Sequence, residues 1–138
     1  MKPWYETFEH GADIGIRGKG RTLEEAFSNG AKALFALMAD LSTIEPQKEI
    51  QVECTAPDRE TLFMVWLNQL IALADIEKMV LSEFNLTIRN NNLTAVARGE
   101  SIDPQKHDLG VEVKGATFTM LRVFREAGYF VAQCVVDV

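Results

Sequence analysis

Two segments of the chain carry apolar residues at the spacing of an amphipathic helix. In residues 23–38 apolar positions recur every three or four residues, and residues 62–74 repeat this i, i+3, i+4, i+7 pattern. Thr22 begins a Thr-x-x-Glu sequence, in which the two side chains can cap the first helix, and Asp58 can cap the second. We therefore predict two helices, each with one buried apolar face.

Most of the remaining sequence alternates between apolar and polar residues, as a half-buried strand does. The segments predicted as strands are residues 4–8, 14–17, 48–55, 81–89, 93–98, 111–124 and 129–138. Residues 90–92 are three asparagines, which tolerate left-handed backbone and predict a tight turn. Residues 101–109 are polar, include a proline and are interpreted as a loop.

The predicted order of elements is ββ-α-β-α-ββ-ββ. Successive hairpins favour an α+β fold with a mostly antiparallel sheet and two amphipathic helices packed on one face of it. The length of 138 residues fits a single domain spanning residues 1–138. The pattern does not fix whether the last strand pairs beside an early one.

Composition places the chain among ordinary globular proteins, with 47% hydrophobic and 25% charged residues. No apolar run approaches the roughly 20 residues that span a bilayer, and the first residues lack the apolar region of a secretory signal. Cys54 and Cys134 stand far apart in strand-like segments and are interpreted as buried thiols. We expect a cytoplasmic protein with no membrane association.

The net charge is −6, from 20 acidic and 14 basic residues, and the sequence has no basic cluster. Such a chain is poorly equipped to hold RNA or DNA through phosphate contacts. We expect no strong direct binding of nucleic acid, so that any role in RNA metabolism would act through a partner protein.

Candidate chemistry lies near both ends of the chain. Residues 8–16 form a glycine-rich stretch with His10 and Asp13, and Asp137 follows an apolar strand beside Val138. Converging carboxylates repel one another unless a cation neutralises them, and an all-oxygen set favours calcium or magnesium. A nearby histidine would also permit manganese or zinc. The alternative is that Asp13 only forms a turn and Asp137 only ends a strand in solvent.

The familiar catalytic motifs are absent. The sequence has no Walker loop, GxGxxG, HExxH, CxxC or serine-nucleophile signature. Lys114 stands in an apolar neighbourhood, where it is either a surface residue of a strand or a partner for a phosphate or carboxylate. His107 lies in the polar loop, and its spacing from other residues does not indicate a role for it.

Several short motifs follow one another over the whole chain. They are residues 8–16 (FEHGADIGI), 22–27 (TLEEAF), 65–70 (VWLNQL), His107, 113–118 (VKGATF) and 136–138 (VDV). This ordered set resembles the motifs of the archease family, whose members are small cytoplasmic proteins. Archeases assist the RtcB-type RNA ligase of tRNA splicing and RNA repair, promoting guanylylation of the ligase histidine and repeated turnover.

The resemblance implies roles for particular residues. Asp13, Asp137 and Val138 match the metal positions of the family, with calcium as the expected ion and magnesium or manganese as alternatives. Lys114 matches a lysine linked to ligase activation, and His10 and His107 match motif histidines that we assign to the same activity. The protein would then be a cofactor of a ligase and not an enzyme itself.

The sequence departs from the family pattern at three positions. Gly11 stands where many members have threonine, Gly115 where alanine is usual, and Thr119 where histidine or serine is common. The first two exchange one small residue for another and should alter only backbone freedom. Thr119 removes a possible ligand or proton carrier, while the predicted metal positions are intact.

Two other functions are alternatives to ligase activation. A free-standing metal-dependent phosphohydrolase could employ the carboxylates, although only His10 is offered as a base and it has no obvious partner. A chaperone-like binding module would dock other proteins on its sheet face and would be indifferent to Asp13, Asp137 and metal.

Overall fold

The computed structural model describes residues 4–138. Its elements, in chain order, are β1 (Trp4–His10), β2 (Asp13–Gly20), α1 (Leu23–Met38), the 3-10 turn η1 (Leu41–Thr43), β3 (Lys48–Thr55), α2 (Arg59–Glu77), β4 (Met79–Arg89), β5 (Asn92–Ser101), α3 (Pro104–His107), β6 (Gly115–Ala116), β7 (Arg122–Glu126) and β8 (Tyr129–Asp137). None of the helices in this part of the chain is long and apolar enough to cross a membrane.

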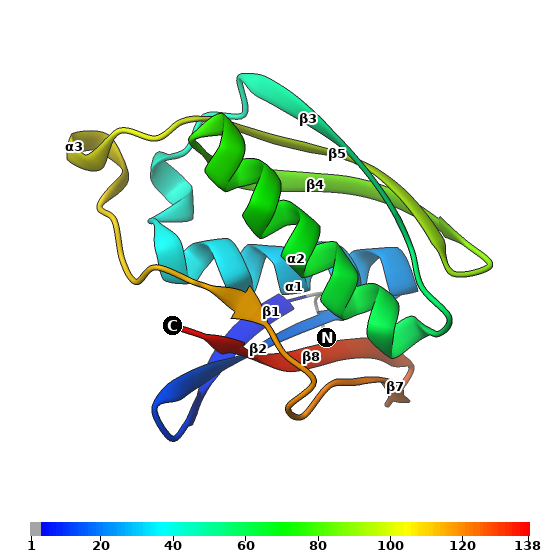
Figure 1. Cartoon of the computed structure of the whole chain (residues 1–138). Helices are drawn as coiled ribbons and strands as arrows, with labels where there is room; N and C mark the ends of the chain where they lie inside the picture. The colour runs from blue at the N-terminus through cyan, green and yellow to red at the C-terminus, as the bar shows by residue number, and fades with distance from the viewer. Residues whose placement is uncertain (1–3) are drawn as a thin grey trace.

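The strands form two antiparallel sheets. One has the order β1-β2-β8-β6, with β7 also pairing with β8, and the other has the order β3-β5-β4. Figure 1 shows α1 and α2 between the two sheets, and both helices contact strands of each. The predicted α+β class is confirmed, but the expected single sheet is divided in two, so the helices are covered on both sides.

Both predicted helix starts are capped by the expected side chains. The hydroxyl of Thr22 accepts a hydrogen bond from the Glu25 amide at 3.1 Å, and the carboxylate of Asp58 accepts one from the Thr61 amide at 2.7 Å. The return bond of the first cap differs from the prediction, because the Glu25 carboxylate accepts from the Arg21 amide at 3.3 Å. The cap therefore fixes the main chain of Arg21, one residue further from the helix than predicted.

A single large apolar core fills the space between the sheets. Its largest fully buried side chain is Trp66 of α2, whose indole N–H donates to the carbonyl of Phe27 in α1 at 3.1 Å. On the other side of α1, strand β2 approaches the helix backbone directly. A Cβ atom on Gly18 would lie 2.1 Å from the Gly30 nitrogen and 2.3 Å from the Ala26 oxygen. Glycine is required there by close approach.

The long strand predicted at residues 111–124 is wrong. Only Gly115–Ala116 and Arg122–Glu126 are strands, and between them the chain turns through Met120, which has φ +53°. Alternating apolar and polar residues indicate an extended backbone with two different faces. They do not indicate whether a neighbouring strand pairs with that backbone. The loop predicted at residues 101–109 likewise contains the short helix α3.

Residues 108–114 lead from α3 to β6, and we call them the connecting segment. The amide of Gly110 donates to the carbonyl of Met38, and that of Val111 donates to the carbonyl of Leu37, both at 2.9 Å. The last carbonyls of a helix have no partner within it. The connecting segment therefore completes the C-terminal end of α1.

Both cysteines are free thiols. Cys134 is buried in the core and Cys54 is half-buried. Burial raises the pKa of the Cys54 thiol to about 11 and that of Cys134 to about 12. Both therefore stay protonated at neutral pH, as expected of packing residues.

Candidate functional site

The hairpin β1–β2 and the last strand bring the two ends of the chain together. His10 pairs with Asp13 at the closed end of the hairpin, where Gly11 has φ +60°. Strand β8 is antiparallel to β2, and Ile14 pairs with Val136. Asp13 and Asp137 are therefore the next residues on two neighbouring strands, as the prediction of a shared site requires.

Main-chain hydrogen bonds add two more of the predicted residues. The Val138 amide lies 3.5 Å from Oδ1 of Asp13, at the limit of a hydrogen bond, and the Lys114 amide donates to the Asp137 carbonyl at 2.8 Å. We call Asp13, Lys114, Asp137 and Val138 the sheet-end cluster. Asp13 and Val138 are half-buried, whereas Lys114, Asp137 and the neighbouring His10 are exposed.

The cluster offers oxygen donors to a cation. Two carboxylates at adjacent positions on paired strands repel one another, and the main-chain oxygens of Val138 extend the same set. Such hard ligands suit calcium or magnesium, with water completing the shell on the exposed side. Within residues 4–138 no three His, Cys, Asp or Glu side chains gather as a metal site. The donor type fits a divalent cation, and these residues would supply only part of the shell of such an ion.

His107 lies elsewhere, at the end of α3, and is fully buried. Its Nδ1 accepts a hydrogen bond from the Asp103 amide at 2.8 Å, and its Nε2 lies 2.9 Å from Oε2 of Glu100. Its main-chain carbonyl accepts from the Asp40 amide at 3.0 Å. These contacts hold α3 against β5 and the start of η1.

Glu100 is the partner that sequence reasoning did not identify. Its carboxylate accepts hydrogen bonds from the Glu45 amide, from His107 and from the Lys106 ammonium, and these lower its pKa to about 2. No spacing in the sequence marks a glutamate near the end of a strand for this role. His107 directly precedes the connecting segment and Lys114 ends it, so His107 is not part of the sheet-end cluster.

Thr119, the departure that removes a possible ligand, lies in the turn between β6 and β7. Its carbonyl accepts from the Val135 amide at 2.9 Å, and its own amide donates to the hydroxyl of Thr117 at 3.1 Å. The residue is exposed. In this protein its main chain fixes the turn to β8.

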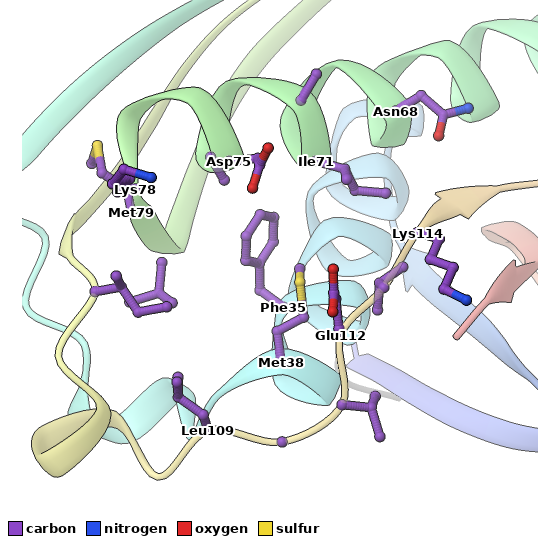
Figure 2. A pocket seen from close by; sticks show the side chains of 17 residues that line it. Phe35, Met38, Asn68, Ile71, Asp75, Lys78, Met79, Leu109, Glu112 and Lys114 are labelled. Atoms are coloured by element: carbon purple, nitrogen blue, oxygen red, sulfur yellow. The ribbon is translucent and has the colours of Figure 1, made fainter.

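Lys114 also stands at the rim of an apolar cavity of about 800 Å³. Figure 2 shows the cavity between α2, the end of α1 and the connecting segment, with the Lys114 side chain directed away from Phe35. Asp75, Lys78 and Glu112 contribute charges of both signs to its lining. Acidic and basic groups balance there, so the cavity has no preference for one sign of charge.

Comparison with known proteins connects this geometry to a family. The model of the archease protein family (MTH1598/TM1083) matches residues 5–138. Protein archease of Pyrococcus furiosus is 41% identical, covering 100% of both chains. Protein archease of Sulfurisphaera tokodaii is 39% identical, covering 97% of this chain and 98% of the relative.

Solved structures agree with the fold. The solution structure of protein 1598 of Methanobacterium thermoautotrophicum has a TM-score of 0.85 at 36% identity, covering 97% of this chain and 98% of that one. The crystal structure of an archease from Thermotoga maritima, described as a possible chaperone, has a TM-score of 0.64 at 18% identity, covering 96% of each chain. The motifs, the family match and the shared fold together establish that this chain belongs to the archease family.

Proposed function

We propose that this protein activates an RtcB-type RNA ligase in tRNA splicing and RNA repair. It would promote guanylylation of the ligase by GTP, allow multiple turnover and act in the cytoplasm. The observation that carries the proposal is the meeting of Asp13, Asp137 and Val138 with Lys114 at one end of the five-stranded sheet. These positions match the archease motif residues, and they come from three separate parts of the sequence.

The arrangement favours a role in phosphate chemistry. Asp13 and Asp137 lie on neighbouring strands, where like charges destabilise a sheet unless something neutralises them. A divalent cation, with calcium first and magnesium or manganese as alternatives, would neutralise them and polarise a phosphate oxygen. Lys114 is exposed and its amide is bonded to the Asp137 carbonyl, so its side chain is available to a triphosphate or to an anionic group of the partner.

The test is guanylylation of the cognate ligase by labelled GTP, with and without this protein. Asp13→Asn and Asp137→Asn remove a charge while keeping the size of the side chain, and Lys114→Met removes the ammonium. We expect each to reduce the stimulated rate by about tenfold or more, corresponding to about 1.4 kcal/mol of lost transition-state stabilisation. Thermal melting should show that each variant remains folded.

Glu53→Gln is the matched control, because it removes one exposed carboxylate from β3, which belongs to the other sheet. It should stimulate as the wild type does. Calorimetric titration with calcium, magnesium and manganese provides an independent readout, since Asp13→Asn and Asp137→Asn should weaken cation binding without any ligase present.

Two results would contradict the proposal. Hydrolysis of a phosphate ester by the protein alone, lost in Asp13→Asn, would favour a phosphohydrolase. Stimulation that is unaffected by all three substitutions and by metal removal would favour a chaperone-like binding module.

A further inference from the structure

The turn between β6 and β7 is fixed to β8 at several points. The amide and the hydroxyl of Thr117 both donate to the Val135 carbonyl, at 3.1 and 2.8 Å, and the Val135 amide donates to Thr119. The side-chain amide of Gln133 donates to the Met120 carbonyl at 3.2 Å. We call residues 117–121 the anchored turn.

The anchored turn exposes two large apolar side chains. Phe118 is 70% exposed and Met120 is 45% exposed. Among the large hydrophobic residues of the described chain, only Ile76 on α2 approaches Phe118 in exposure, at 69%. Exposed aromatic side chains on a rigid support are typical binding hot spots, because little conformational freedom is lost when they are buried.

The charge around the turn differs from that of the whole chain. Residues 114–125 contain the exposed bases Lys114, Arg122 and Arg125 and no acidic residue, although the protein carries a net charge of −6. Of the carboxylates beside this stretch, that of Glu126 lies 3.9 Å from the Lys19 ammonium and that of Glu60 accepts from the Val123 amide at 3.1 Å. A complementary partner surface would therefore be acidic at its rim. The turn also follows Lys114 after only two residues of strand, so whatever covers it lies next to the sheet-end cluster.

We propose that the anchored turn is the docking element for the ligase, with Phe118 and Met120 entering an apolar pocket that has an acidic rim beside the nucleotide site. This inference rests on the proposed function and assigns binding of the ligase and its activation to two different groups of residues. Phe118 and Met120 supply affinity, and the sheet-end cluster supplies activation.

A protein occupant fits better than RNA. The two side chains together offer apolar anchors, and methionine packs into protein pockets more readily than it stacks on bases. Because the net charge of the protein is −6, the surface outside the anchored turn would repel the phosphates of an RNA chain. Contact with RNA therefore becomes an outcome that the test distinguishes.

The experiment measures the guanylylation rate against the concentration of this protein, without RNA. Phe118→Ala should raise the half-maximal concentration by about tenfold or more while the maximal rate stays unchanged, as expected for a lost hot spot. Phe118→Leu should restore most of the affinity. Lys114→Met should lower the maximal rate, because Lys114 belongs to the sheet-end cluster.

Ile76→Ala is the matched control, since it truncates an equally exposed apolar residue on α2. It should leave the whole curve unchanged, and neither alanine variant should lower the melting temperature appreciably. Raising the salt concentration should raise the half-maximal concentration if the rim of the partner pocket is acidic.

A Phe118→Ala curve that coincides with the wild-type curve would overturn the inference. So would a defect that is seen in RNA sealing but not in guanylylation, because Phe118 would then contact RNA. A direct binding isotherm between the two purified proteins separates the two hypotheses. Phe118-dependent binding without any stimulation by the wild type would support docking and overturn the proposed function.

Discussion

His107 shows how much of a residue's role depends on its neighbours. The Asp103 amide donates to Nδ1, so the ring proton is assigned to Nε2, which faces the Glu100 carboxylate. Lys106 donates to the same carboxylate at 3.0 Å. The buried histidine therefore belongs to a small polar network, and its ring has no direct access to a ligand.

The first prediction concerns the stability of this network in acid. The pKa of Glu100 is lowered from 4.5 to about 2, so its ionised form stabilises the fold. That stabilisation is complete above pH 4.5 and is lost as the pH falls from about 4.5 to about 2. Glu100→Gln should lower the melting temperature at neutral pH, and its difference from the wild type should shrink across that range.

Melting curves at neutral pH and at several acidic values provide the measurement. Lys106, His107 and Glu45, the other ionisable groups of the network, are present in both proteins. Glu49→Gln, which removes an exposed partner of Arg98, is the control. A difference from the wild type that stays constant from neutral pH to pH 2 would show that Glu100 does not gain stability by ionisation.

At the scale of elements, prediction succeeded where local chemistry decides the structure. The strand predicted at residues 48–55 is β3, and the asparagine turn is formed with Asn90 and Asn91 at φ +49° and +62°. Both helix starts follow from their caps. These features depend on periodicity and on single side chains, which the sequence displays directly.

Prediction failed where a segment is extended but packs against something other than a strand. In the false strand at residues 111–124, Val111 bonds to the end of α1, and the anchored turn bonds to β8 at single points without forming a regular strand. The division into two sheets was missed for a related reason. Both helices contact strands of both sheets, so their apolar residues are covered on two sides, which the helical spacing alone does not show.

The next prediction tests the close contact between β2 and α1. Gly18→Ala places a methyl group against helix backbone that cannot move aside, and it should destabilise the protein by about 1–3 kcal/mol. Gly115→Ala is the control, because its new Cβ would meet only Asn68 Oδ1 at 3.4 Å. It should change the free energy of unfolding by less than about 1 kcal/mol.

Urea unfolding of both variants measures these free energies. Equal midpoints for Gly18→Ala and the wild type would mean that β2 can shift away from α1. A large loss in Gly115→Ala would show instead that the start of β6 is more crowded than the distances indicate.

For the molecule as a whole, the site was partly predictable. A glycine-rich link and a terminal aspartate suggested that the two ends meet, and the pairing of β2 with β8 brings Asp13 beside Asp137. The positions of His107, Glu100 and Phe118 could not be predicted. They depend on contacts among segments distant in the sequence, and nothing local signals such contacts.

A prediction at this scale concerns the cooperativity of unfolding. Because both sheets share one core around Trp66, the predicted single domain should unfold in one step. In a Trp4→Phe background, Trp66 fluorescence and far-ultraviolet circular dichroism should give coincident denaturation midpoints. Separate midpoints would show that the three-stranded sheet unfolds independently of the five-stranded one.

The bonding of the connecting segment to α1 has a consequence for its exchange of hydrogen with solvent. The amides of Gly110, Val111 and Lys114 lie in backbone with no regular structure, yet each donates to a carbonyl of a helix or strand. Such amides exchange only when the element beneath them opens. In deuterium oxide the amides of Gly110 and Val111 should retain their protons about as long as those of α1, and the amide of Lys114 about as long as those of β8. Lys114 would then stand on a backbone as persistent as the core.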